Sequence, residues 1–228
     1  MRRPVEHGNV VTSVLLGGSS ILYALSTKGN PEVVIFWLPI FIGLFEYDVP
    51  LKLAIRKRSD VFLLSTISLI ALISLLIDLY VILPYILFLA AYALRIPLAR
   101  RKLNRYGNAV GLLAYSLLFT LTLEIAIPLS LLLAATLFLY LLGSEFAVLA
   151  MLKRDRRLLL YNLLPPFLGL LSIPFFIYSL SLVRITVSLF GTDIRKVGLA
   201  ETFLLPAVSF SLLISLHYGA LSPLISWG

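Results

Sequence analysis

Apolar residues dominate this chain in long runs, and short polar segments separate the runs. A transmembrane helix needs roughly 17–25 mostly apolar residues to cross a hydrocarbon core about 30 Å thick. Runs of about this length predict nine spans, at 10–27, 31–47, 61–77, 79–97, 107–123, 125–151, 158–174, 175–192 and 197–217. We therefore expect an all-α fold in which residues 1–228 form a single polytopic transmembrane helical bundle.

The basic residues support this division because they fall in every second connection. They are Arg2 and Arg3, Lys52 to Arg58, Arg100 to Arg105, Lys153 to Arg157, and Arg195 with Lys196. In the intervening connections Lys28 is the only cation. Cytosolic loops of membrane proteins are enriched in Lys and Arg. The alternation therefore predicts a cytosolic N-terminus and a C-terminus on the outer side.

The segment 158–192 is the ambiguous part of this layout. As one span it would move the next basic connection to the outer side, whereas two short spans keep the alternation intact. Pro165, Pro166 and Pro174 each interrupt or kink a helix. We favour two spans, with the break near Pro174.

Composition points to lipid as the solvent of the fold. Sixty percent of the 228 residues are hydrophobic and 13% are charged, and the mean hydropathy is +1.02. A soluble domain could not cover so much apolar surface with so few charges, so we expect a multi-pass protein of the cell membrane. The net charge of +8 lies in short connections rather than along a surface helix, which argues against a nucleic-acid partner. The absence of cysteine excludes disulfides and thiolate chemistry.

Polar residues near the predicted cytosolic boundary form the candidate ligand-binding site. Ionisable groups at membrane depth are costly, so they usually face the interior of the bundle and pair there. Their clustering toward one side predicts a polar cavity that opens to the cytosol. Its candidate lining residues are Glu6, His7, Glu46, Asp48, Arg95, Asn108, Glu145, Arg184 and Glu201. The alternative is that the cations extend to the interface and the carboxylates only neutralise neighbouring cations.

The most distinctive polar segment is Glu6-His7-Gly8-Asn9, just before the first apolar run. His7 at the mouth of a cavity could donate or accept a hydrogen bond or bind a metal. Asn9 could also cap the first helix by accepting from its free backbone N–H groups, and the two interpretations are compatible. Catalytic signatures such as the Walker A loop, G-x-S-x-G and H-E-x-x-H do not occur, so no catalytic residue is assigned.

Several short segments, in order and over nearly the whole chain, resemble the YwiC-like family of integral membrane proteins. They are Pro4 to Gly8, Pro50 to Ala54 with Arg56 to Arg58, Arg100 to Lys102 with Asn108 and Leu113 to Leu117, Tyr140 to Gly143 with Lys153 to Arg156, and Lys196 to Glu201. The chain departs from the family pattern at Asn9 and lacks the acidic residue common before Asn108. The resemblance implies a membrane fold and leaves the activity open, because the family is uncharacterised.

The layout also resembles UbiA-type intramembrane prenyltransferases, which have nine helices, a cytosolic N-terminus and acidic loops after helices 2 and 6. Here those connections carry Glu46 and Asp48, then Glu145 and Asp155. The aspartate-rich motifs that hold Mg²⁺ in that family do not occur. Glu46 and Asp48 are two residues apart, so on one helix they point about 200° away from each other. The resemblance implies a divergent lipid- or isoprenoid-handling protein, with a divalent cation such as Mg²⁺ only if transferase chemistry is retained.

Three classes of function fit these observations. A lipid- or isoprenoid-handling protein would grip an anionic headgroup with Arg and Lys, and would use Glu46, Asp48 or Glu145 through a metal or as a base. A small-solute transporter would place its charges at the midplane, beside broken helices. A non-catalytic assembly or scaffold protein needs only the basic cytosolic loops. The first class ranks first here because the charges lie nearer one face, with membrane lipid as the expected partner.

Overall fold

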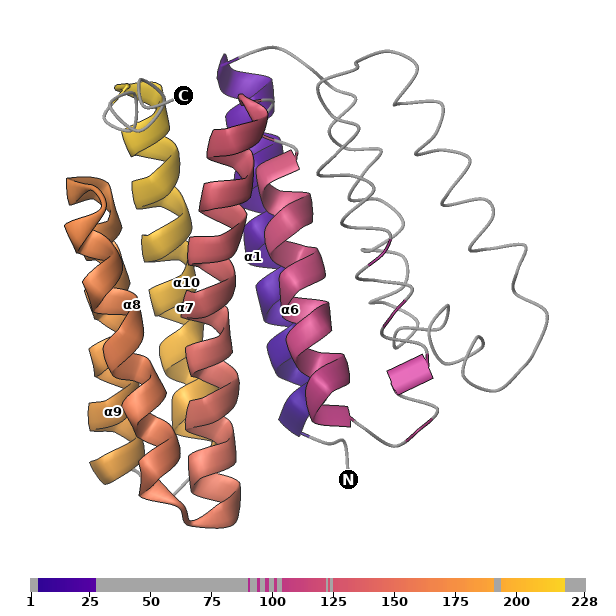
Figure 1. Ribbon diagram of the computed structural model, residues 1–228, viewed down its shortest axis with the longest axis vertical. Helices are drawn as coiled ribbons and strands as arrows, with labels where there is room; N and C mark the ends of the chain where they lie inside the picture. Colours follow the sequence, from indigo (N-terminus) through magenta and orange to yellow (C-terminus); the bar gives the residue numbers. More distant parts are fainter. Residues whose placement is uncertain are drawn as a thin grey trace. The chain divides into compact units, whose positions relative to one another are not determined.

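The structure is a computed structural model that describes residues 4–27, 90, 94, 97, 98, 101, 104–121, 123, 125–190 and 194–219. Within these ranges all regular structure is helical, with six α-helices, three 3₁₀-helices and no strand (Figure 1). The expected all-α class is confirmed for this part of the chain. The predicted spans at 31–47 and 61–77, and most of the span at 79–97, lie outside the described residues.

The helix α1 covers Pro4–Thr27 and so begins earlier than the apolar run that predicted it. Proline suits the first turn of a helix because the N–H that it lacks would have no partner there. The expectation that Asn9 caps this helix is wrong, because Asn9 lies inside α1 rather than before it.

The described chain divides into two structural units, Ser20–Ala134 on the one hand and Met1–Ser19 with Ala135–Gly228 on the other. The first unit contains α6 (Asn104–Leu121), close to the predicted span at 107–123. Its Ser and Thr side chains bond back to their own helix: Thr120 Oγ1 donates to the Ser116 carbonyl (3.2 Å) and Ser116 Oγ to the Leu112 carbonyl (2.9 Å). Such bonds satisfy hydroxyls in apolar surroundings.

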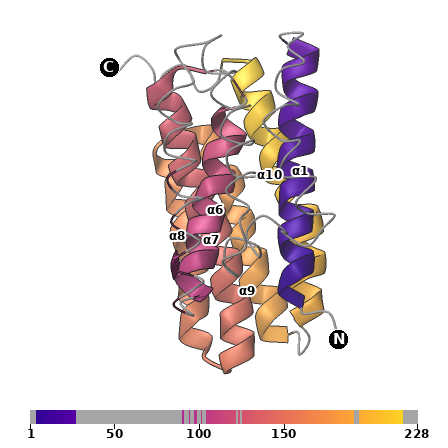
Figure 2. The same cartoon turned by 90° about the vertical axis from the view of Figure 1, so that its right-hand side faces the viewer.

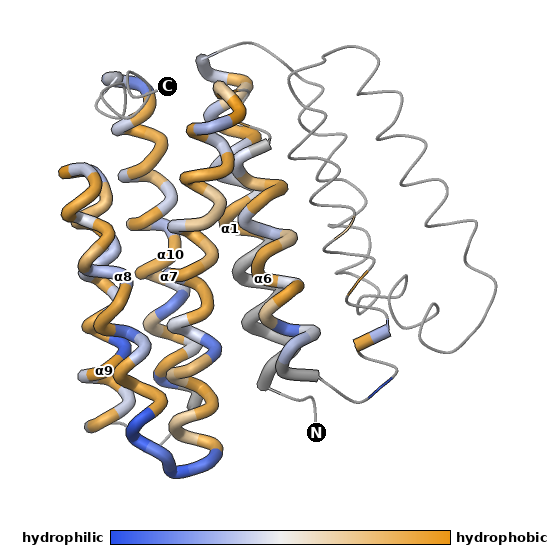
Figure 3. Tube along the Cα trace, in the orientation of Figure 1, coloured by the Kyte–Doolittle hydropathy of each residue, from blue (hydrophilic) through white to orange (hydrophobic). Residues whose placement is uncertain are grey.

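Two helices among the described residues are long and apolar enough to cross a membrane, judged by length and composition alone. They are Ile127–Lys153, which is α7, and Lys196–His217, which forms most of α10 (Ile194–His217). Both match predicted spans within about three residues at each end. Figure 3 shows their mostly hydrophobic course, with hydrophilic residues gathered where α7 ends.

Between α7 and α10 the chain forms a helical hairpin. Its first arm consists of η2 (Arg156–Leu163), α8 (Leu164–Phe167) and η3 (Leu168–Leu170), and its second arm of η4 (Ile173–Leu180) and α9 (Ser181–Phe190). Helical geometry is lost at Ser172, whose φ of −164° and ψ of 144° are extended. The predicted break near Pro174 is therefore confirmed, with Pro174 in the first turn of the second arm.

The two arms pack antiparallel against each other, and the second arm also runs along α10 in both views (Figures 1 and 2). Near the tip the approach is close at Gly169, where an added Cβ would lie 2.9 Å from Cγ and Cδ1 of Phe176. At the other end, small side chains let the helices meet: Ala147 and Ala150 of α7 pack with Leu159 of η2 and Val197 of α10. Glycine and alanine thus set the distance between these helices.

A glycine-to-alanine pair tests this packing. Gly169→Ala should lower the free energy of unfolding by about 1–3 kcal/mol, because the new methyl group overlaps the ring of Phe176. Gly198→Ala in α10 is the matched control, since its added Cβ meets nothing within 4 Å. The control should raise stability by roughly 0.5–1 kcal/mol, because Ala favours the helix over Gly. Thermal melting of the purified protein compares them. Equal melting of Gly169→Ala and the parent protein would contradict the close approach of the arms.

Candidate functional site

Most polar residues of the helix α9 lie on its buried face, whereas Thr186 is exposed and its Oγ1 donates to the Leu182 carbonyl (3.4 Å). Ser181 and Arg184 are both fully buried (0% exposed), and Ser188 continues the same face one turn further on. Positions three and seven residues apart lie on one side of a helix. On the other side Leu182 and Leu189 are exposed, at 40% and 43%. A helix that is polar inward and apolar outward is typical of lipid surroundings rather than water.

Arg184 connects three helices through one guanidinium group. Its Nε and Nη2 donate to the two carboxylate oxygens of Glu201 in α10, with 3.0 Å between Nη2 and Oε2. Its Nη1 donates to the backbone carbonyl of Tyr140 in α7 (2.7 Å), and its Cζ lies 3.9 Å from the centroid of the Tyr140 ring. This two-bond arrangement of guanidinium and carboxylate is among the strongest polar contacts in proteins.

Asn162 in η2 adds the first arm of the hairpin to this contact. Its Nδ2 donates to the Gly143 carbonyl (3.1 Å), and its own carbonyl accepts from Ser181 Oγ (2.8 Å). Gly143 is required here, because an added Cβ would lie 2.6 Å from Asn162 Oδ1 and 3.2 Å from Arg184 Nη1. Because the Gly143 carbonyl can only accept, the amide atom that faces this oxygen must be the nitrogen. Among the described residues, Asn162 Oδ1 is buried and has no hydrogen-bond partner.

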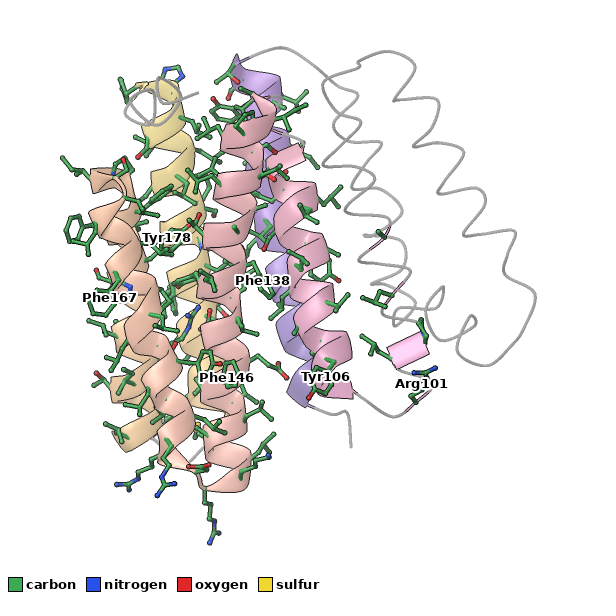
Figure 4. All side chains as sticks on the ribbon, in the orientation of Figure 1. Arg101, Tyr106, Phe138, Phe146, Phe167 and Tyr178 are labelled. Carbon is green, nitrogen blue, oxygen red and sulfur yellow. The ribbon has the colours of Figure 1, made fainter. Side chains whose placement is uncertain are left out.

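Aromatic side chains of η4 cover the contact on the side toward the tip of the hairpin. Tyr178, which points from the hairpin toward α7 in Figure 4, forms a hydrogen bond with Thr136 Oγ1 (3.0 Å). The rings of Tyr140 and Tyr178 are 5.5 Å apart, and those of Phe175 and Tyr178 are 5.8 Å apart. Tyr140 Oη is a second buried atom that has no hydrogen-bond partner within the described part of the chain. We call the whole set the Arg184 cluster: Thr136, Tyr140, Gly143, Asn162, Tyr178, Ser181, Arg184 and Glu201.

The Arg184 cluster is a closed and electrically balanced site. Arg184 is fully buried, and the side chain of Glu201 is 14% exposed. Arginine stays protonated in proteins, so the carboxylate of Glu201 supplies the opposite charge that an apolar interior demands. Tyr140 is the central residue of α7, which places the cluster near the middle of a helix long enough to cross a membrane. Among the described residues, no group of three His, Asp or Glu side chains could hold a metal ion.

The structure joins two of the nine predicted cavity residues, Arg184 and Glu201, and makes them each other's partners. Glu145 is half-buried on α7, and Asn108 is half-buried on α6 in the other unit. Glu6 and His7 lie in the first turns of α1, where only the backbone is described. Three more of the predicted residues lie outside the described residues, namely Glu46, Asp48 and Arg95.

Sequence reasoning missed every member of the cluster except Arg184 and Glu201. Tyr140 and Gly143 are three residues apart and so share a helix face. This spacing is hard to recognise in the sequence, because nearly all the surrounding residues are apolar too. Asn162 is the one amide in the apolar stretch 158–171, and this is a usable signal because a polar side chain at membrane depth usually has a partner.

Glu201→Gln tests the stabilising role of the ion pair. The substitution keeps the shape of the side chain but leaves the buried Arg184 charge without a counter-charge, which should cost about 3–5 kcal/mol of unfolding free energy. The matched control is Asp155→Asn, which removes a carboxylate from an exposed position and should change stability far less. Thermal and chemical unfolding in detergent measure both. A Glu201→Gln protein as stable as the parent would show that the pair does not stabilise the fold.

No family model matches the chain. No curated protein and no solved structure matches it either. The resemblance to YwiC-like proteins and the UbiA-like layout stay predictions.

Proposed function

We propose that the chain is a multi-pass protein of the cell membrane, with nine spans, a cytosolic N-terminus and an outer C-terminus. The alternation of basic connections and the inward polar face of α9 support this layout. The 3₁₀ segments support two crossings by the hairpin. A 3₁₀-helix rises about 2.0 Å per residue instead of 1.5 Å, so the two arms reach roughly 28 and 31 Å, which is close to the thickness of a hydrocarbon core.

Within this layout, we propose that the protein transports a small solute and that the Arg184–Glu201 pair is its gate. The observation that carries the proposal is an ion pair with a fully buried Arg184 at the middle of α7, at the level where both arms change between 3₁₀- and α-helix. Transporters place their binding sites near the midplane at discontinuous helices. This feature separates the transport hypothesis from the lipid-handling one, which expected the charges nearer one face.

The chemistry of the pair favours a solute that carries a carboxylate. The guanidinium fork of Arg184 already holds one carboxylate by two nitrogens, and a solute carboxylate presents the same two oxygens. Exchange of one carboxylate for another avoids leaving the arginine unpaired in an apolar interior. A solute carboxylate that displaces Glu201 brings a second negative charge to the cluster, so we expect uptake of the solute together with a proton.

Transport can be measured with purified protein in liposomes, using labelled lactate, succinate and glutamate under an inward proton gradient. At least one of them should accumulate above protein-free vesicles. Arg184→Lys keeps the charge but loses the fork, so it should reduce uptake at least tenfold. Arg101→Lys makes the same change at an exposed position and should leave uptake intact.

If Arg184→Lys does not fold, Glu201→Asp takes its place, because a shorter carboxylate side chain weakens the same pair. Two results would refute the proposal: no carboxylate accumulates, or the variants of the pair transport as well as the parent protein.

A lipid- or isoprenoid-handling protein is the second candidate. The described observation in its favour is Glu145, a half-buried carboxylate on α7, and its other proposed groups, Glu46 and Asp48, lie outside the described residues. This hypothesis predicts an isoprenoid or anionic lipid that co-purifies with the protein and is lost in Glu145→Gln. Mass spectrometry of the purified protein tests it, and a parent protein free of such lipid would count against it.

A further inference from the structure

We propose that five exposed cations at one end of the hairpin form a binding site for the phosphate group of an anionic phospholipid. We call them the basic end: Lys153, Arg154, Arg156, Arg157 and Lys196. In the proposed layout this end faces the cytosolic leaflet. The proposal does not depend on the solute proposed for the Arg184 cluster.

The basic end draws on two distant parts of the chain. Four of its cations lie at the connection between α7 and η2, where Figure 3 shows the most hydrophilic stretch of this unit. Lys196 comes from the start of α10. It adjoins Val197, whose side chain packs against Ala150 of α7 and Leu159 of η2. This packing holds the start of α10 beside the connection, so all five charges occur at the same end of the unit.

These cations have no counter-charge in the described part of the protein. Asp155 is the one carboxylate in the connection, and it accepts a hydrogen bond from the Arg157 backbone N–H (3.1 Å). It caps η2 in this way rather than pairing with a guanidinium. The five exposed cations therefore leave their N–H donors available to a ligand.

Arg154 is held in a backbone conformation that favours glycine. Its φ is 54°, and it is the one non-glycine residue with positive φ among those described. It ends α7 in a Schellman-type turn, in which the Asp155 N–H donates to the Ala150 carbonyl (3.0 Å) and the Arg154 N–H to the Met151 carbonyl (3.4 Å). Glycine is the usual residue at this position because it has no Cβ penalty. Arg154 is strained in its backbone, exposed, and without a partner among the described residues, a combination that points to a role for its charge.

The surroundings favour a lipid phosphate over free phosphate. Arginine forks bind phosphate oxygens in pairs. The exposed apolar side chains of Leu152 (58%) and Leu160 (61%) flank the cations on α7 and η2, and they would lie against acyl chains. Each cation near an anionic leaflet contributes about 1 kcal/mol of attraction, so five of them can select anionic lipid over zwitterionic lipid.

Arg154→Gly separates charge from folding, because it removes the cation and also relieves the backbone strain. The variant should melt at the same temperature as the parent protein or higher when no lipid is added. Its affinity for phosphatidylglycerol should fall about fivefold, as the loss of one cation predicts. Arg154→Lys should retain the affinity. Arg101→Gly, which removes another exposed cation, should retain it too.

Native mass spectrometry and melting shifts of the full chain in detergent give the affinities for phosphatidylglycerol and phosphatidylcholine. Saturable binding of phosphatidylglycerol alone, weakened in Arg154→Gly, supports the site. Three results would overturn it: equal binding of both lipids, equal losses in Arg154→Gly and Arg101→Gly, or full displacement by inorganic phosphate, which would assign the site to the free anion. Solute uptake is measured separately in the same variants. A negative result for lipid binding therefore leaves the transport proposal intact.

Discussion

The ion pair between Arg184 and Glu201 is the constraint around which the hairpin unit is organised. A guanidinium in an apolar interior must have an opposite charge and acceptors for its hydrogens, because the penalty for burying it alone is several kcal/mol or more. Glu201 supplies the charge, and the Tyr140 carbonyl accepts a third bond. Those partners lie on α10 and α7. The hydrogen bonds and the ion pair of Arg184 therefore fix the position of α9 along both α7 and α10.

The rest of the unit follows from bringing these helices together. Gly143 lets the amide of Asn162 and the guanidinium of Arg184 share the same stretch of α7, and Gly169 lets the two arms close near their tip. The 3₁₀ segments run for 8 residues each in η2 and η4, longer than is common for this helix type. They make each arm longer than an α-helix with the same number of residues. The arms can therefore approach the length of α7 and α10 with fewer residues.

An apolar pair of similar volume could replace a buried ion pair at little or no cost in stability. The charged pair therefore fits the proposed role as a gate. Within the described part of the chain, Asn162 Oδ1 and Tyr140 Oη beside the pair have no hydrogen-bond partner, although buried polar atoms in native proteins usually have one. The proposed exchange of carboxylates would use both features, because it needs a charged site with free hydrogen-bonding capacity.

The sequence predicted the helices well and their contacts poorly. Apolar runs locate α6, α7 and α10 to within about three residues, because hydrophobic length is a local property. The break of the hairpin followed from proline chemistry. Arg184 and Glu201 were both predicted as site residues, but their pairing depends on how α9 and α10 pack. The role of Tyr140, whose carbonyl lies 44 residues from Arg184 along the chain, depends on the same packing.

The central claim is that this ion pair joins α10 to a hairpin that crosses the membrane twice, and cysteine labelling on cells tests it most directly. The chain has no native cysteine, so Arg156→Cys, Ile173→Cys and Tyr218→Cys each introduce one thiol at an exposed position. A membrane-impermeant maleimide should label Ile173→Cys and Tyr218→Cys on intact cells, but Arg156→Cys only after permeabilisation. Labelling of Arg156→Cys and Ile173→Cys under the same condition would show that the hairpin does not cross, and that the pair is not held within the membrane.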